Sequence, residues 1–100
     1  MLAKVLIKRK FVMGKDKEIN ALLNKFRSEA VGQPGLVSAE SLVMDEEPQN
    51  LLVISTWASL DDWNRWKDSD VRKKYEGMLE IYQEKPSEYE AYRLRSFSSQ

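Results

Sequence analysis

Residues 51–79 read LLVISTWASLDDWNRWKDSDVRKKYEGML, and they contain all three tryptophans of the 100-residue chain. The apolar run 51–54 shows no alternation, which is typical of a β-strand covered on both faces. Ser59 and Asp62 form a pair resembling a capping box, with Asp where Glu or Gln is usual, and they predict a short helix. Ser69 predicts the start of a second helix. We therefore expect this stretch to form a strand, then a short helix, and then a second helix.

The rest of the chain predicts three more strands and one long helix. Apolar residues alternate with lysines over residues 2–12, which indicates a strand. Apolar residues recur at helical spacing over residues 15–31, which indicates an amphipathic helix ended by a Gly- and Pro-containing turn. Further strands are expected at 36–44 and 87–97, with a polar turn over 45–50.

The inner faces of the last two elements can be assigned from their spacing. On the second helix of the tryptophan-containing stretch, one apolar face is expected to hold Val71, Tyr75, Met78 and Tyr82. On the C-terminal strand, one face is expected to hold Tyr89, Ala91 and Phe97. The tail 98–100 is expected to fray.

The order of elements predicts the fold. Counting the two C-terminal helices as one broken crossover gives βαββαβ, the ferredoxin-like α+β arrangement, in a single domain spanning residues 1–100. A four-stranded antiparallel sheet then carries helices on one face and leaves the other face open. Because the strand at 51–54 is apolar on both sides, we expect a second copy of the chain to cover the open face as a homodimer.

Composition excludes several classes of function. Lys and Arg total 16, as do Asp and Glu, and this balance argues against a nucleic-acid partner. No apolar run approaches the roughly 20 residues of a membrane span. The charged segment 1–12 lacks a signal-peptide cleavage site, so a cytoplasmic location is expected. The chain has no His and no Cys, and the acidic cluster 45–47 matches no metal loop, so no metal is expected.

Three segments resemble a known family. They are GQPGL at 32–36, VISTWASLDDW at 53–63 and PSEYEAY at 86–92. In this order and spacing they resemble the antibiotic biosynthesis monooxygenase (ABM) domain family, whose fold is the dimeric α+β barrel. The resemblance covers most of the chain and supports the ferredoxin-like assignment, whereas one fold hosts many functions.

The resemblance implies chemistry without a cofactor. Some members of the family oxidise quinols or polyphenols with O₂, and the substrate anion itself donates the electron. Other relatives degrade haem through an Asn, a Trp and a His. In this sequence Trp66 matches the Trp, but Lys8 lies near the Asn position and Glu76 near the His position. Haem degradation is therefore not expected.

The expected function is a cofactor-independent monooxygenase acting on a small aromatic or quinol substrate with O₂. The alternative is a non-catalytic module of the same fold that binds a small hydrophobic ligand or a partner. Catalytic residues are not assigned, and the substrate-binding candidates are Trp66, Tyr75, Arg9, Met78 and Trp57.

These candidates carry competing interpretations. Trp57 is expected to pack in the core or an interface and Trp63 in the core, whereas Trp66 is equally suited to packing and to lining a cleft. Tyr75 can serve as core or as a pocket edge. Arg9 is the one charge on the apolar face of its strand, and it can be an edge or snorkelling side chain or an anchor for an anionic quinolate or carboxylate.

Overall fold

The computed structural model describes residues 1–95 of the chain. Its elements run in the order predicted: β1 (Ala3–Lys10), α1 (Asp16–Val31), β2 (Leu36–Val43), β3 (Asn50–Trp57), α2 (Leu60–Lys67), α3 (Asp70–Glu80) and β4 (Glu88–Arg93). The predicted C-terminal strand therefore ends earlier than expected. The expectations for Phe97 and for the tail 98–100 lie outside the described residues.

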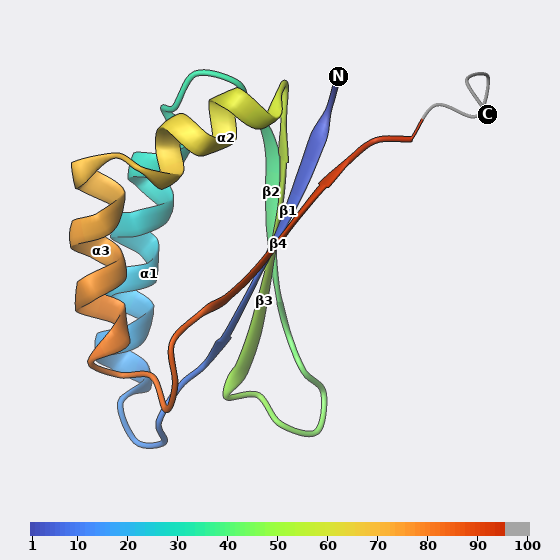
Figure 1. Ribbon diagram of the computed structural model, residues 1–100. Helices are drawn as coiled ribbons and strands as arrows, with labels where there is room; N and C mark the ends of the chain where they lie inside the picture. The colour runs from blue at the N-terminus through green and yellow to red at the C-terminus, as the bar shows by residue number, and fades with distance from the viewer. Residues whose placement is uncertain (96–100) are drawn as a thin grey trace.

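The strands form one antiparallel sheet in the order β2-β3-β1-β4, which confirms the ferredoxin-like topology. In the central pair Leu6 lies opposite Ile54, and Arg9 lies opposite Leu51. Helices α1 and α3 lie side by side on one face of the sheet, and α2 crosses one end of it (Figure 1). The opposite face carries no helix within residues 1–95 (Figure 1).

The short helix α2 begins where the sequence predicts, at a serine cap. The Ser59 Oγ accepts a hydrogen bond from the Asp62 backbone N–H at 3.1 Å, and the Ser59 hydroxyl donates to the Asp62 carboxylate at 2.8 Å. Helix α3 has the same kind of start, because the Ser69 Oγ accepts from the backbone N–H of Arg72 at 3.2 Å. Each serine satisfies a backbone donor that the first helical turn leaves unpaired.

Gly35 lies in the turn between α1 and β2 and contacts the start of α2. Its φ is +87°, a left-handed conformation that only glycine adopts without strain. A Cβ at this position would collide with the side chain of Asp62. The Gly35 carbonyl also accepts a hydrogen bond from the Ala58 N–H at 2.7 Å. The GQPGL segment therefore brings the edge strand against the capped end of α2.

The core lies between the sheet and the two long helices. The inner face of β1 is buried as its alternation predicts, through Ala3, Val5 and Ile7. Helix α1 contributes Ile19 and Phe26, and the other fully or nearly buried apolar side chains are Phe11, Leu51, Trp57, Trp63, Trp66 and Leu79. All three tryptophans are therefore in the core.

The buried face of α3 differs from the prediction. Val71 and Met78 are 42% and 40% exposed, so they do not face the sheet. The buried side chains are Arg72, Glu76 and Leu79, and Tyr75 is half-buried. Tyr82 is half-buried too, but it lies beyond the end of α3 and not on the helix as expected. Arg72 and Glu76 therefore lie on the buried face, where the prediction placed Val71 and Met78. The helix can turn this face inward because the charges find ion-pair partners in the interior.

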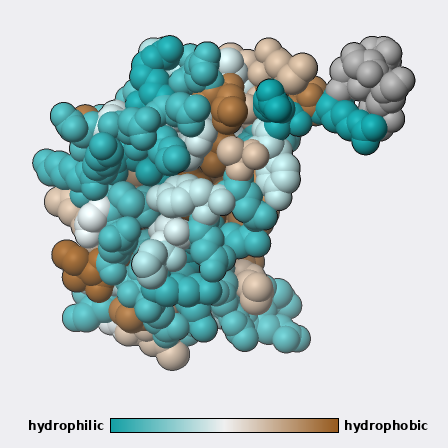
Figure 2. Space-filling model, in the orientation of Figure 1, coloured by the Kyte–Doolittle hydropathy of each residue, from teal (hydrophilic) through white to brown (hydrophobic). Residues whose placement is uncertain are grey.

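The apolar strand β3 has helices over one face only within the described chain. Ser55 and Trp57 are buried under the helices, but Leu52 and Ile54 on the other face are half-buried. Full cover on both faces is therefore not present in one chain. In the view of Figure 2 hydrophilic residues cover most of the surface and apolar residues form separate patches. Within residues 1–95, no helix combines the length and the apolar character needed to cross a membrane.

Candidate functional site

A cavity of about 460 Å³ lies between helix α1 and the inner face of the sheet. This volume falls in the range of small-molecule sites. Its lining is mainly apolar and aromatic, and all three tryptophans take part. The charged residues of the lining are arginines: Arg9 from β1, Arg27 from α1 and Arg72 from α3.

Aromatic rings form one wall of the cavity. The Trp57 and Trp63 ring centroids lie 5.9 Å apart, and those of Phe26 and Trp66 lie 6.1 Å apart, both pairs tilted. The indole N–H of Trp57 donates to the Ser55 Oγ at 3.0 Å, which satisfies its only donor inside the protein. Tilted aromatic pairs are favourable contacts beyond the area they bury, so this wall is held in place.

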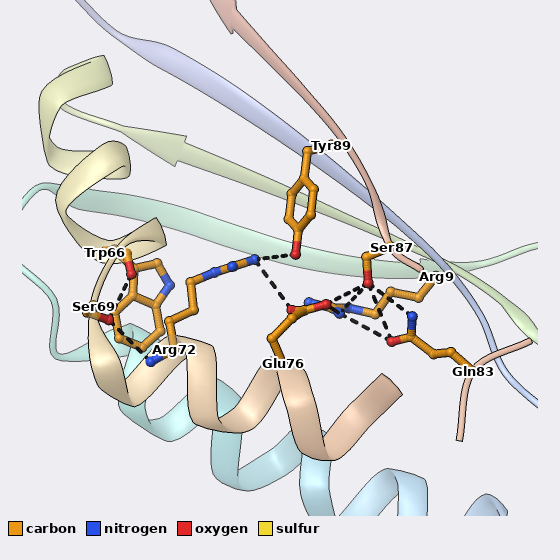
Figure 3. A network of polar contacts seen from close by, with 8 residues as sticks. All are labelled: Arg9, Trp66, Ser69, Arg72, Glu76, Gln83, Ser87 and Tyr89. Carbon is orange, nitrogen blue, oxygen red and sulfur yellow. Dashed lines mark hydrogen bonds and ion pairs between the residues drawn. The ribbon is translucent and has the colours of Figure 1, made fainter. Parts of the chain in front are cut away.

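Arg9 lies at the centre of a buried polar network (Figure 3). Its Nη1 donates to Glu76 Oε1 at 2.5 Å, to Ser87 Oγ at 2.9 Å and to Gln83 Oε1 at 3.4 Å. The residue is only 5% exposed, so the interpretation of Arg9 as an edge or snorkelling side chain is wrong. Its guanidinium can be buried here because a carboxylate from α3 meets it inside the fold.

Arg72 approaches the same carboxylate from helix α3. Its Nη2 lies 3.5 Å from Glu76 Oε2 and donates to the Tyr89 hydroxyl at 3.1 Å (Figure 3). The guanidinium carbon lies 5.1 Å from the ring centroids of both Trp63 and Tyr89. Cation–π contacts of this kind hold a guanidinium plane in a defined orientation.

Glu76 therefore stands between two arginines, and its pKa reflects both neighbours. Burial acts to raise the pKa of this carboxyl, but the hydrogen bonds and charges of Arg9, Ser87 and Arg72 outweigh burial. The net effect is a pKa below the ordinary value. Glu76 is thus ionised at neutral pH and stabilises the two guanidinium groups.

The structure separates the substrate-binding candidates into two groups. Trp66, Arg9 and Trp57 line the cavity, as does Trp63, which was expected to be plain core. Tyr75 stacks on Phe26 with ring centroids 5.3 Å apart and is outside the lining. Met78 is 40% exposed and is also outside it. Direct ligand contact by Tyr75 and Met78 stays a prediction that this geometry does not favour.

Sequence reasoning missed Arg72 and Glu76 as part of this region. A signal was present, because the two residues are four apart on one helix and therefore lie on the same face. A lone arginine on the apolar face of the first strand also requires a buried counter-charge. Within residues 1–95, no cluster of three or more acidic side chains is arranged to hold a metal ion.

The fold and the cavity define an α+β ferredoxin-like domain with an aromatic, arginine-containing pocket beneath its helices. The family model for antibiotic biosynthesis monooxygenase matches residues 3–77. The chain belongs to this family. No protein with a curated description matches the sequence.

Solved structures share the fold at low sequence identity. A conserved protein from Methanosarcina mazei Go1 is 20% identical with a TM-score of 0.88, and the match covers 95% of this chain and 94% of that one. SnoaB, a cofactor-independent oxygenase from Streptomyces nogalater, is 18% identical with a TM-score of 0.80, and the match covers 96% of each chain. Rv0793 from Mycobacterium tuberculosis is 11% identical with a TM-score of 0.83, and the match covers 96% of this chain and 97% of that one.

Proposed function

We propose that this protein is a cofactor-independent monooxygenase that oxidises a small aromatic or quinol substrate with O₂. The observation that carries the proposal is the cavity of about 460 Å³, which combines an aromatic wall with guanidinium groups. Aromatic walls bind planar rings, and fixed cations stabilise an anion formed on such a ring. The family membership and the shared fold of a cofactor-independent oxygenase support the same reaction class.

The reaction needs no cofactor if the substrate ionises in the cavity. In an anthrone-like substrate, loss of a proton to solvent from an activated CH₂ group gives a carbanion or enolate, which transfers one electron to O₂ and yields a substrate radical and superoxide. Their recombination forms a C–O bond, and protonation gives a hydroperoxide. The hydroperoxide then loses water, which takes up the second hydrogen of the same carbon, and a carbonyl product remains. One oxygen atom of O₂ enters the product and the other enters water.

The cavity residues have separate roles in this proposal. Trp66 stacks against the substrate ring, and Arg9 stabilises the anion before electron transfer. Arg72 provides a second positive charge on the same cavity. Tyr75 acts as a positioning residue, because it stacks on Phe26 and Phe26 lines the cavity.

Oxygen uptake tests the proposal directly. The protein is mixed with a panel of reduced quinones and anthrone-like phenols, and O₂ consumption is followed with an electrode. We expect a rate above the non-enzymatic background that falls at least tenfold in Trp66→Phe or Arg9→Gln. Arg65→Gln serves as a control, because Arg65 forms an exposed ion pair with Asp62 outside the cavity. Background rates across the whole panel would contradict the proposal.

A non-catalytic ligand-binding module is the second candidate. It is favoured by the lining itself, which contains no Asp or Glu to act as a general base. The nearby carboxylate, Glu76, is engaged by two arginines. Because all three tryptophans line the cavity, ligand entry is expected to quench their fluorescence. Saturable quenching without oxygen uptake would support the module over the enzyme.

We also propose that the protein acts as a homodimer through the sheet face that carries no helix in residues 1–95. The register places Leu42 beside Leu52 and Leu6 beside Ile54 on this face. Leu42 is 46% exposed in the single chain, and the other three are half-buried. Apolar side chains gathered on one face of a sheet are typical of a subunit interface.

A further inference from the structure

We propose that the cavity takes a carboxylate-bearing aromatic ligand, with the carboxylate bound jointly by Arg9 and Arg72. Glu76 acts as the positioning residue that holds both guanidinium groups. The inference rests on the proposed function only in assigning the ligand class of the same cavity. It is carried by three observations: unused guanidinium donors, an excess of positive charge, and the aromatic wall beside them.

Arg9 has donors that the protein does not use. Its hydrogen bonds to residues 1–95 all involve Nη1, so the edge formed by Nε and Nη2 is unpaired there. Nε is buried and has no acceptor. An unpaired donor inside a protein is costly, and native structures retain few of them. Because Nε is closed off from solvent, Nη2 is the donor of this edge that a carboxylate in the cavity can reach.

Arg72 also has donors that the described chain does not use, although they do not share one edge of the guanidinium. Its side chain is 5% exposed, and within residues 1–95 its polar contacts involve Nη2 alone. Nε and Nη1 therefore remain available on a residue that lines the cavity. The rings of Trp63 and Tyr89 hold the guanidinium plane, so these donors have a fixed direction before a ligand arrives.

The charge around the two arginines is not balanced. Glu76 is the carboxylate paired with both of them, and one negative charge cannot neutralise two positive ones. The cavity lining adds Arg27 and contains no Asp or Glu. An anion entering this space therefore meets a net positive potential in a site of reduced dielectric constant.

The donor pattern favours a carboxylate over a phenolate. A carboxylate has two oxygens with about four lone-pair sites and can bridge two guanidinium groups. A phenolate presents a single oxygen, and a neutral quinol leaves the charge uncompensated. The aromatic wall of Trp57, Trp63 and Trp66 beside the arginines provides the place for the ring that carries the carboxylate.

The test compares two ligands of the same shape on the unmodified protein. Binding of 2-naphthoate and of its neutral counterpart 2-naphthamide is measured by titration calorimetry and by tryptophan quenching. We expect 2-naphthoate to bind roughly 10- to 100-fold more tightly, the range for hydrogen bonds to charged groups. Equal affinities, tighter binding of the amide, or no binding of either compound would overturn the inference.

Two variants separate the arginine site from general stability. Arg72→Gln is expected to weaken 2-naphthoate binding about tenfold or more and to leave 2-naphthamide unchanged. Arg65→Gln is the control, because Arg65 forms an exposed ion pair with Asp62 outside the cavity. If Arg72→Gln does not fold, Arg72→Lys keeps the charge and loses the fixed guanidinium donors, and it is expected to lower the preference for 2-naphthoate. An unchanged preference in a folded Arg72 variant would overturn the inference.

Failure of the carboxylate site and failure of the proposed monooxygenase activity give different experimental results. Oxygen uptake with neutral quinols does not depend on carboxylate selectivity, whereas the binding comparison involves no turnover. A protein that oxidises neutral quinols and prefers the amide would retain the function and lose the carboxylate site. A protein that prefers 2-naphthoate without any oxygen uptake would retain the carboxylate site as a ligand-binding module.

Discussion

Arg9 and Glu76 lie 67 positions apart in the sequence and form a buried ion pair of 2.5 Å. Their side chains are 3% and 11% exposed. The pair joins the central strand β1 to helix α3 across the core. It therefore fixes how α3 sits on the sheet, and it sets the direction of the guanidinium groups that line the cavity (Figure 3).

Replacing Glu76 with Gln is expected to destabilise the protein strongly. The change leaves two buried guanidinium groups without a counter-charge, and breaking a buried pair in this way costs roughly 3–5 kcal/mol. Glu84→Gln is the matched control, because Glu84 pairs with Lys10 at the surface and such pairs contribute about 0–1 kcal/mol. Urea unfolding measures both. Similar losses in the two variants would contradict a structural role for the buried pair.

The contribution of Glu76 to stability is expected to depend on pH. Its pKa in the folded protein lies below the ordinary value of 4.5, so the unfolded state binds the proton more readily. Stability from the ionised carboxylate is fully present above about pH 4.5 and is lost as the pH falls through the folded-state pKa. The difference in unfolding free energy between wild type and Glu76→Gln should therefore shrink as the pH is lowered. A constant difference from neutral pH to pH 3 would refute this assignment.

Alanine at two glycines is expected to have opposite effects. Gly35→Ala introduces a Cβ that collides with Asp62 and forces a left-handed conformation, which costs at least ~1 kcal/mol. Gly77→Ala lies inside α3 with open space around the new Cβ, and it should stabilise by about 0.5–1 kcal/mol. Thermal unfolding of both variants measures the two effects. Stabilisation by Gly35→Ala would show that the approach to Asp62 relaxes freely.

Ser59→Ala tests the cap that begins α2. The hydroxyl satisfies the Asp62 N–H and also bonds the Asp62 carboxylate, so its loss is expected to cost about 1 kcal/mol. Ser38→Ala, on an exposed position of β2, should be within roughly 0.5 kcal/mol of wild type. Chemical denaturation at one pH compares the two. Equal stabilities would mean that the cap is not needed for α2.

Ile54→Lys tests the proposed dimer. The substitution places a charge at the centre of the helix-free sheet face, next to Leu6, and is expected to leave a monomer. Ile81→Lys is the control, since Ile81 is 77% exposed and lies after α3. Light scattering at micromolar concentration gives the mass of each protein. A wild-type mass equal to that of one chain would contradict the proposed homodimer, regardless of the masses of the two variants.

Local patterns predicted most of the fold. Alternation over residues 2–12 identified the buried face of β1, because successive side chains of a strand point to opposite sides. Ser59 and Ser69 marked both helix starts, because their hydroxyls bond backbone donors within the next turn. The least accurate prediction concerned α3. Its buried face departs from the apolar stripe because the interior contains an arginine able to pair with Glu76.

The candidate site was predicted only in part. Trp66 and Arg9 line the cavity, but the sequence did not indicate that Arg72 would join them. Nor did it show that Tyr75 stacks behind Phe26. These relations depend on how α3 is rotated against the sheet, and local spacing carries no information about that rotation.

The amino-acid sequence by itself determined the order of strands and helices, their caps, and the absence of His and Cys, because these follow from interactions between near neighbours and from composition. Only the tertiary structure decided which charges meet in the core. Arg9, Arg72 and Glu76 are brought together by the packing of α3 on β1, across long sequence separations. That packing places the one arginine on the apolar face of β1 beside Arg72 in the lining of one cavity.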